Sequence, residues 1–393
     1  MKNVRNDFKV ATQLTRLGRD HDIQMGFVNM PVYRGSTVVF KTVEDLQAFN
    51  APFPYGTFGT PTIKSLEDAW SSISGAEGTV ISPSGLGALA LAFFTTLKAG
   101  DHVLIPDSAY HPTRGLCDNL IKKFGIEISY YDPMIGAEIE SLLRSNTSTI
   151  FLESPGSLTF EIQDVPAITA IAKRYGAKTI IDNTWATPLF FRAHEHGCDI
   201  VVEAGTKYLG GHSDLLMGMV SANASTWPAL RATYDAMAML PGAEDCFLAL
   251  RGLRTLDLRL REAQARGMEL ANWMSEQPEI DQVLHPAFES CPGHALWKRD
   301  YLGSTGLFSV VLKPEFKKKN LEFMLNHMSI FGMGYSWGGF ESLIIPFDGV
   351  GKRTVTSWKP KGLCLRLQVG LEDMSDLKRD LRQGLDRLSE LVS

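Results

Sequence analysis

Two residues with reactive side chains, Asp182 and Lys207, each follow a short apolar run. Asp182 comes directly after residues 179–181, and Lys207 lies a few residues after the run at 200–202. Taken singly, an acid that caps a strand and a lysine in a surface loop are both common. Together they supply an amine that can bond an aldehyde as an imine and an acid that can keep a pyridine nitrogen protonated. Pyridoxal phosphate needs both groups, so the pair predicts a site for this cofactor.

The elements that must position this pair are short apolar strands alternating with helices. The predicted strands lie at residues 78–81, 102–105, 148–152, 179–181 and 200–202. A helix with Pro166 near its start and Gly176 at its end lies between the third and fourth strands. Because these runs are apolar throughout, they indicate strands buried on both faces of a parallel sheet. Ligands bind at the carboxyl ends of such strands, so Asp182 and Lys207 should meet at one edge.

The letters DNTWATP at 182–188 and AGTKYLGGHSD at 204–214 resemble the cofactor-lysine segment of the Cys/Met-metabolism pyridoxal-phosphate enzymes, of fold type I. The resemblance covers nearly the whole chain. It implies a mostly parallel seven-stranded sheet with helices on both faces, a smaller α/β C-terminal domain and an extended N-terminal arm. The implied divisions are an arm at 1–60 that contacts a neighbouring subunit, a cofactor-binding domain at 61–253 and a C-terminal domain at 254–393.

The resemblance also implies roles for individual residues. Lys207 carries the pyridoxal 5'-phosphate, Asp182 pairs with its ring nitrogen, and Tyr110 stacks on its ring. The phosphate is bound by a helix N-terminus, which offers free amides to an anion, and by a tyrosine from the neighbouring subunit. These phosphate residues are Ser84, Gly85, Leu86, Thr206 and Tyr55. Arg366 grips the substrate carboxylate by a two-point fork, and the other implied substrate residues are Tyr335, Ser336, Trp337, Tyr234 and Tyr55.

Within the family, DNTWA at 182–186 and YSWGGFESL at 335–343 are most similar to the cystathionine β-lyases. This implies a carbon–sulfur lyase of methionine biosynthesis and transsulfuration that cleaves L-cystathionine, or another cysteine S-conjugate, by α,β-elimination. The products would be a thiol, which is homocysteine from cystathionine, with pyruvate and ammonia. Lys207 would remove the α-proton, and Lys207 or Tyr110 would supply a proton to the leaving sulfur.

Two positions depart from the family pattern. Thr57 stands where relatives usually have an arginine that reaches the phosphate of the next subunit, and Ala204 stands where many have a serine. The phosphate site therefore loses a charge and a hydroxyl. We expect weaker cofactor retention than in relatives, unless another basic residue substitutes.

Three other functions fit part of the sequence. A γ-acting relative (cystathionine γ-synthase, cystathionine γ-lyase or methionine γ-lyase) usually has a glutamate where this chain has Tyr335, and an aromatic wall cannot pair with a polar group in the same way. A dinucleotide-dependent oxidoreductase would use the G-x-G-x-x-A pattern at 85–90 with Asp107, but leaves Asp182 and Lys207 unexplained. A metal site at His194 and His196 is not expected, because two positions apart on a helix they point to different sides.

Composition limits the remaining choices. The chain has 393 residues, 44% hydrophobic and 21% charged, with a net charge of -5, which is typical of a folded protein without affinity for nucleic acid. Five cysteines without a C-x-x-C pair indicate a reducing compartment. With no apolar run long enough for a membrane span or secretory signal, we expect a cytoplasmic enzyme. The family resemblance implies a homotetramer, built as a dimer of dimers.

Overall fold

A computed structural model describes residues 8–348 and 353–390 of the chain. Its larger sheet has seven strands in the order β1-β7-β6-β5-β4-β2-β3. The strands are β1 (Gly78–Ser82), β2 (His102–Pro106), β3 (Glu127–Tyr131), β4 (Thr147–Glu153), β5 (Lys178–Asp182), β6 (Ile200–Glu203) and β7 (Gly218–Ala222). The five strands expected from apolar runs are all present, so the fold class is confirmed.

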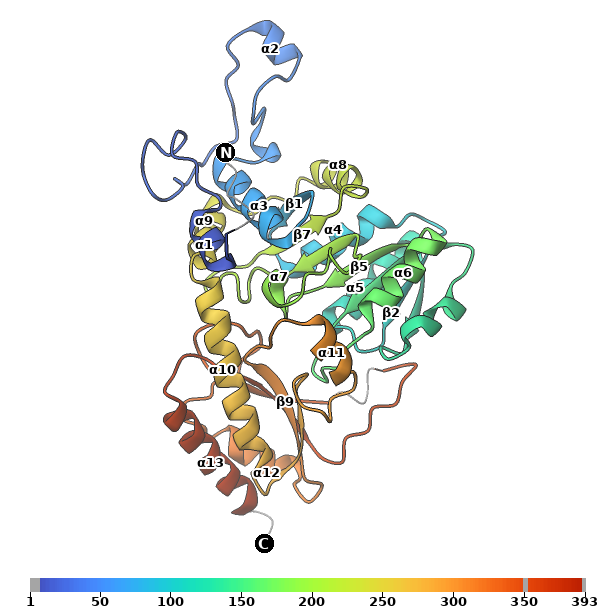
Figure 1. Ribbon diagram of the computed structural model, residues 1–393, viewed down its shortest axis with the longest axis vertical. Coiled ribbons are helices and arrows are strands. Elements are labelled where there is room, and N and C mark those ends of the chain that lie inside the picture. Colours follow the sequence, from blue (N-terminus) through green and yellow to red (C-terminus); the bar gives the residue numbers. More distant parts are fainter. Residues whose placement is uncertain (1–7, 349–352, 391–393) are drawn as a thin grey trace.

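The central strands are buried on both faces because helices cover each side of the sheet (Figure 1). One face packs Val103, Phe151 and Ile180 against α4 (Gly85–Thr96), α5 (His111–Asn119) and α8 (Trp227–Met237). The other face packs Leu104 and Ile181 against α3 (Pro61–Ser74), α6 (Val165–Tyr175), α7 (Thr187–Phe190) and α9 (Ala243–Leu253). Alternate side chains of one strand therefore enter different layers, as the pleat requires.

The apolar runs do not predict strands β3 and β7. β3 lies at an edge, where only its last residue, Tyr131, is buried. β7 runs antiparallel to both of its neighbours, β1 and β6, and is the reason why the sheet is mostly rather than wholly parallel. The predicted helix before β5 is α6, which begins after Asp164, whose side chain accepts from Ala167 N, and ends at Gly176 with φ +75°.

A second sheet lies in the lower half of Figure 1 and is antiparallel, in the order β10-β11-β9-β8. Its strands are β8 (Ile280–Leu284), β9 (Leu307–Leu312), β10 (Leu343–Phe347) and β11 (Cys364–Gln368). Helix α10 (Leu256–Ser275) runs from the larger sheet to this one, and α12 (Lys318–Leu325) and α13 (Met374–Glu390) pack beside it with a shared core. The domain boundaries at 60 and 253 stay predictions.

The N-terminal segment has little regular structure and extends outward (Figure 1). It contains α1 (Val10–Arg16), α2 (Val43–Gln47) and the short 3-10 helix η1 (Gly56–Phe58). Apolar side chains in it are unusually exposed, with Phe27 at 72% and Val39 at 89% of their surface. The remaining short elements are α11 (His294–Asp300), η2 (Ile121–Phe124) and η3 (Gly136–Leu142). In the described residues, no helix has the length and apolar character needed to cross a membrane.

Candidate active site

Lys207 lies in the turn that follows β6, where it is partly buried. Its Nζ donates to Ser336 Oγ at 2.6 Å and lies 5.2 Å from the centre of the Trp337 ring. Burial lowers the pKa of Lys207 to about 8; the Arg366 charge lowers it further, while Asp182 opposes the shift. Far more of this amine than of an ordinary lysine is therefore neutral near neutral pH, and the neutral form is the one that attacks an aldehyde or accepts a proton.

A tight turn brings Ser336 and Trp337 to the lysine. Ser336 and Gly338 both have positive φ, at +76° and +83°. A Cβ added at Gly338 would lie 3.0 Å from Tyr208 N and 3.2 Å from Lys207 Cα. Only glycine fits so close to the backbone of the lysine in this conformation, so the turn between β10 and the preceding segment is shaped around Lys207.

Asp182 ends β5, beside the turn that carries Lys207. Burial raises the pKa of Asp182, and hydrogen bonds from the Thr184 hydroxyl (2.5 Å) and amide (3.0 Å), with the Lys207 charge, act against this rise. Thr184 Oγ1 also accepts from Ala204 N at 2.8 Å. One threonine thus links the acid to the start of the lysine turn, and strands β5 and β6 are parallel neighbours as predicted.

Two further carboxyl groups end the strands on either side, and the sequence reasoning missed both. Glu153 of β4 is in register with Asp182 and accepts from Tyr110 N at 2.8 Å; burial raises its pKa well above the usual range, with Asp182 adding to the rise. Glu203 of β6 accepts from Trp70 and Asn183, and burial raises its pKa to about 7. Their place as the last residue of a strand, which Asp182 shares, was the available signal.

Tyr110 and Arg366 reach the same region from two different elements. Tyr110 precedes α5 and is about half exposed; burial raises the pKa of its phenol, the charges of Glu153 and Asp182 add to the rise, and Arg366 acts against it. Arg366 lies on β11, is buried, and donates to Gly334 O at 3.1 Å. Within the described part of the chain its Nε has no hydrogen-bond partner. Burial lowers its pKa to about 10, so it stays charged and keeps a donor for an anionic ligand.

Three of the predicted phosphate residues, Ser84, Gly85 and Leu86, form the start of α4. Ser84 caps this helix by accepting from Gly87 N at 3.0 Å, and the first amides of a helix, here those of Gly85 and Leu86, have no acceptor within it. A Cβ at Gly85 would lie 2.8 Å from Ala204 Cβ, so the helix start touches the lysine turn. The hydroxyl of Thr206 donates to Met217 O and accepts from Met217 N.

A cavity of about 510 Å³ opens beside these groups. Thr206, Tyr335, Ser336 and Trp337 are among its lining residues. Such a volume suits a small ligand. The structure therefore brings together residues from the lysine turn and from the 335–337 turn, as the sequence predicts.

Two predicted residues lie elsewhere in this chain. The prediction for Tyr234 is wrong: its ring is buried in the core between α8 and the sheet, and its hydroxyl donates to Ile81 O at 2.9 Å. Residues on the buried face of an amphipathic helix point to the sheet, and Tyr234 is one of them. Tyr55 lies on the extended N-terminal segment and is 45% exposed.

The structure also bears on two of the competing interpretations. Asp107, which a dinucleotide site would need, accepts instead from the backbone amides of Thr354, Val355 and Thr356. The prediction that His194 and His196 lie on a helix is wrong, because residues 193–197 form turns. There His194 contacts Cys198 O, and His196 stacks on Phe191.

These groups fit pyridoxal phosphate. The partly buried amine of Lys207, with its lowered pKa, matches the cofactor's aldehyde, and the partly buried acid Asp182 matches its ring nitrogen. The helix start beside the lysine turn matches the phosphate, and the free donor of Arg366 matches a substrate carboxylate. The described residues contain no group of three or more side chains suited to hold a metal ion.

Comparisons with known proteins agree with this chemistry. A "Putative cystathionine beta-lyase" of Saccharomyces cerevisiae is 59% identical over 84% of this chain and 97% of its own length. The cystathionine beta-lyase MetC of Escherichia coli is 40% identical over 97% of this chain and 99% of its own. The crystal structure of cystathionine gamma synthase from Xanthomonas oryzae in complex with aminoacrylate and cysteine has a TM-score of 0.89 and 29% identity, covering 98% of this chain and 100% of that one. Residues 11–386 match a family model, and the chain belongs to the Cys/Met metabolism PLP-dependent enzymes.

Proposed function

We propose that this enzyme is a carbon–sulfur β-lyase that cleaves L-cystathionine to homocysteine, pyruvate and ammonia. The observation that carries the proposal is the surroundings of Lys207, whose amine is partly buried, hydrogen-bonded to Ser336 and subject to the opposing charges of Asp182 and Arg366. Relatives named cystathionine beta-lyase, at 40% identity and above, support the choice of substrate.

In the proposed mechanism, Arg366 binds the α-carboxylate of the substrate, and its unpartnered Nε is suited to that role. Lys207 would hold the cofactor through Nζ, and Asp182 would keep its ring nitrogen protonated. Pyridoxal phosphate, when bound, draws electrons away from the α-carbon. With the substrate bound, Lys207 Nζ would accept the α-proton.

Breaking the bond between the β-carbon and sulfur needs a proton for the departing thiolate. Lys207 has just gained one, and the phenol of Tyr110, whose pKa is raised by burial, keeps its own at neutral pH. Either group is suited to protonate the sulfur, and hydrolysis of the remaining three-carbon unit gives pyruvate and ammonia. Tyr335 and Trp337 on the cavity wall favour this β-elimination over the γ-acting chemistry of relatives.

The test is the keto acid that the holoenzyme releases from L-cystathionine. Pyruvate as the main product supports β-elimination, whereas 2-oxobutyrate as the main product would overturn it in favour of a γ-acting enzyme. Lys207→Ala should lose the visible absorbance of the bound cofactor and lower kcat by roughly 10³-fold or more. Full turnover in that variant would contradict the role of Lys207. A panel of cysteine S-conjugates would then rank cystathionine against other thioethers.

We also propose that the enzyme assembles from several copies of this chain. The exposed apolar side chains of the N-terminal arm, and Tyr55 among them, are suited to contact a neighbouring copy, with Tyr55 reaching its phosphate site. A homodimer would be the smallest active unit, and two such dimers would form a homotetramer. With Thr57 in place of an arginine, we expect the cofactor to dissociate more readily than from relatives. The five cysteines are buried and unpaired, which supports a cytoplasmic location.

A further inference from the structure

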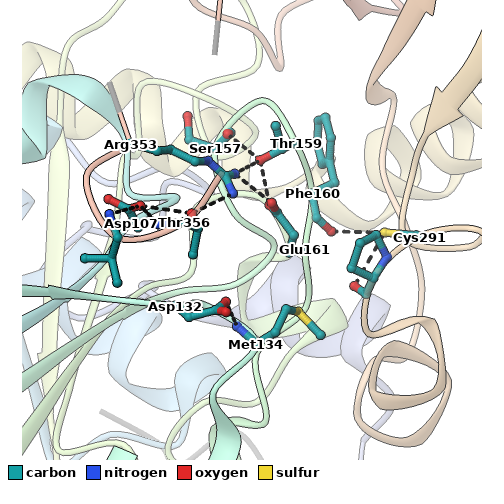
Figure 2. Close-up of polar contacts among 12 residues, drawn as sticks. Asp107, Asp132, Met134, Ser157, Thr159, Phe160, Glu161, Cys291, Arg353 and Thr356 are labelled. Carbon is teal, nitrogen blue, oxygen red and sulfur yellow. Dashed lines mark hydrogen bonds and ion pairs between the residues drawn. The ribbon is translucent and has the colours of Figure 1, made fainter. Parts of the chain in front are cut away.

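Residues 353–356 lie between β10 and β11, on the part of the chain that forms the smaller sheet, yet they contact the end of β2 in the larger one (Figure 2). The contacting residues Asp107 and Thr354 are 247 positions apart in the sequence. Two separate carboxylates hold this segment, Asp107 and Glu161. We call residues 353–356 the latch.

The first anchor is Asp107, which directly follows β2. Its two oxygens accept from the amides of Thr354 (2.9 Å), Val355 (2.9 Å) and Thr356 (2.7 Å), and from the hydroxyls of the two threonines. Arg114 balances its charge at 2.9 Å. Burial alone would raise the pKa of Asp107, but the hydrogen bonds from the latch outweigh it and lower the pKa to about 2. The anchor therefore stays charged throughout the physiological range.

The second anchor is an ion pair that is almost completely buried. Arg353 Nη2 donates to Glu161 Oε1 at 2.6 Å and to Thr159 Oγ1 at 2.7 Å (Figure 2). The side chains of Arg353 and Glu161 are only 9% and 6% exposed. Arg353 Nη1 also donates to Thr356 Oγ1 at 3.3 Å, so the two anchors are joined within the latch.

The first anchor and the latch itself both connect along the chain to active-site residues. Asp107 begins the loop that ends at Tyr110, and the amide of Tyr110 donates to Glu153 beside Asp182. In the other direction the latch precedes β11, which carries Arg366. The larger sheet supplies Lys207, Asp182 and Tyr110, and only the smaller sheet supplies Arg366. The latch is thus a direct polar connection between the two halves of the site.

We propose that the latch fixes Arg366 relative to Lys207 and Tyr110, which makes Arg353 and Asp107 positioning residues for the substrate carboxylate. This inference rests on the proposed role of Arg366. An arginine fork binds a carboxylate well only when both groups are held in place, and small displacements weaken such binding sharply. Breaking the latch should therefore weaken the binding of molecules with a carboxylate and spare molecules without one.

The test compares glycine with methylamine, which differ only by the carboxylate, as ligands of the holoenzyme. Binding is followed by the change in visible absorbance of the bound cofactor. We expect Arg353→Met to weaken glycine binding by about 10-fold and to change methylamine binding by less than about 2-fold. Equal weakening of both ligands, or unchanged glycine binding in the folded variant, would overturn the proposal.

A matched control and a second variant separate positioning from loss of stability. Arg382→Met removes another ion pair, between Arg382 of α13 and Glu279. It should lower the melting temperature without changing glycine binding. Asp107→Asn weakens the other anchor and should reproduce the selective loss, and Arg353→Lys, which keeps the charge, should restore part of it. A wild type that releases no pyruvate from cystathionine would contradict the proposed lyase function. The comparison of glycine with methylamine would still decide whether the latch positions Arg366.

Discussion

Burial governs the protonation of the groups around Lys207. Loss of water is the largest cause of the pKa shifts of Lys207, Asp182 and Arg366. Neighbouring charges come second for Lys207 and Arg366, and hydrogen bonds from Thr184 come second for Asp182. For the lysine, burial favours the neutral amine, which is the reactive form. For the acid, hydrogen bonds from Thr184 and the charge of Lys207 oppose the same effect. The site therefore contains an amine that can react and an acid that needs its partners to remain ionised.

The lowered pKa of Lys207 predicts how the apoprotein takes up its cofactor. Only the neutral amine attacks the aldehyde, so the rate constant for binding pyridoxal phosphate should rise with pH to a plateau, with a midpoint at about 8. Asp182→Asn removes a charge that raises this pKa, and should shift the midpoint to lower pH. Stopped-flow absorbance measures both. A midpoint near the ordinary lysine value of 10.5 would contradict the burial of the amine.

The lowered pKa of Lys207 also makes the free energy of unfolding of the apoprotein depend on pH. Because the pKa of Lys207 is lower in the folded apoprotein than in the unfolded chain, its contribution favours folding at high pH and is lost as the pH falls through about 8.

The contribution of Glu153 to folding stability changes with pH in the opposite direction to that of Lys207. Its pKa in the folded state is raised well above the ordinary 4.5, so its protonated form favours folding, and this contribution is lost as the pH rises. Glu153→Gln keeps an oxygen to accept from Tyr110 N and removes the titration. The melting temperature of the variant, relative to that of the wild type, should therefore increase as the pH is raised from about 5 to about 8. Parallel thermal melts measure the difference, and two curves with a constant offset would show that Glu153 does not titrate in this range.

At the scale of elements, the turn at 335–339 tests how closely backbone shape controls the lysine. Gly338→Ala adds a Cβ within 3.0 Å of Tyr208 N at a residue with φ +83°, so the turn must move away from Lys207. We expect kcat to fall by at least about 10-fold, because the contacts of Ser336 and Trp337 with the amine are lost. The control is Gly332→Ala, where the nearest atom, Leu343 Cδ2, lies at an ordinary 3.5 Å. Similar activity in both variants would show that this approach is unimportant.

Sequence patterns predicted the elements that repeat a simple rule. Wholly apolar runs marked the strands buried on both faces, and a helix between proline and glycine marked α6. They did not mark β3, whose edge position leaves it partly exposed, and they also did not mark β7, although its length and composition resemble those of β1. The site could be predicted as far as its residues follow strand ends, as Asp182 does. The latch could not, because its partners are set by tertiary packing across 247 positions.

At the scale of the whole molecule, the proposed sharing of Tyr55 between subunits can be tested by mixing two inactive variants. If Tyr55 serves the neighbour's site, a hybrid of a Lys207→Ala subunit with a Tyr55→Ala subunit has one complete site. Equal amounts, unfolded together and refolded with cofactor, should recover about a quarter of wild-type activity, since about half of randomly formed dimers are hybrids. Each variant refolded alone serves as the control. No recovery, with hybrids detected by a tag on one variant, would place Tyr55 in its own subunit's site.

The pairing of β1 with β7 has a consequence for incomplete chains during translation. The hydroxyls of Thr79 in β1 and Ser221 in β7, which are 142 positions apart in the sequence, form a hydrogen bond. Strand β7 lies between β1 and β6 in the sheet. A nascent chain that stops before residue 218 therefore presents two open sheet edges, with β1 unattached to the rest. Open apolar edges are templates for intermolecular pairing. Early termination of translation should thus yield aggregates that require chaperones or proteolysis, rather than a shortened enzyme.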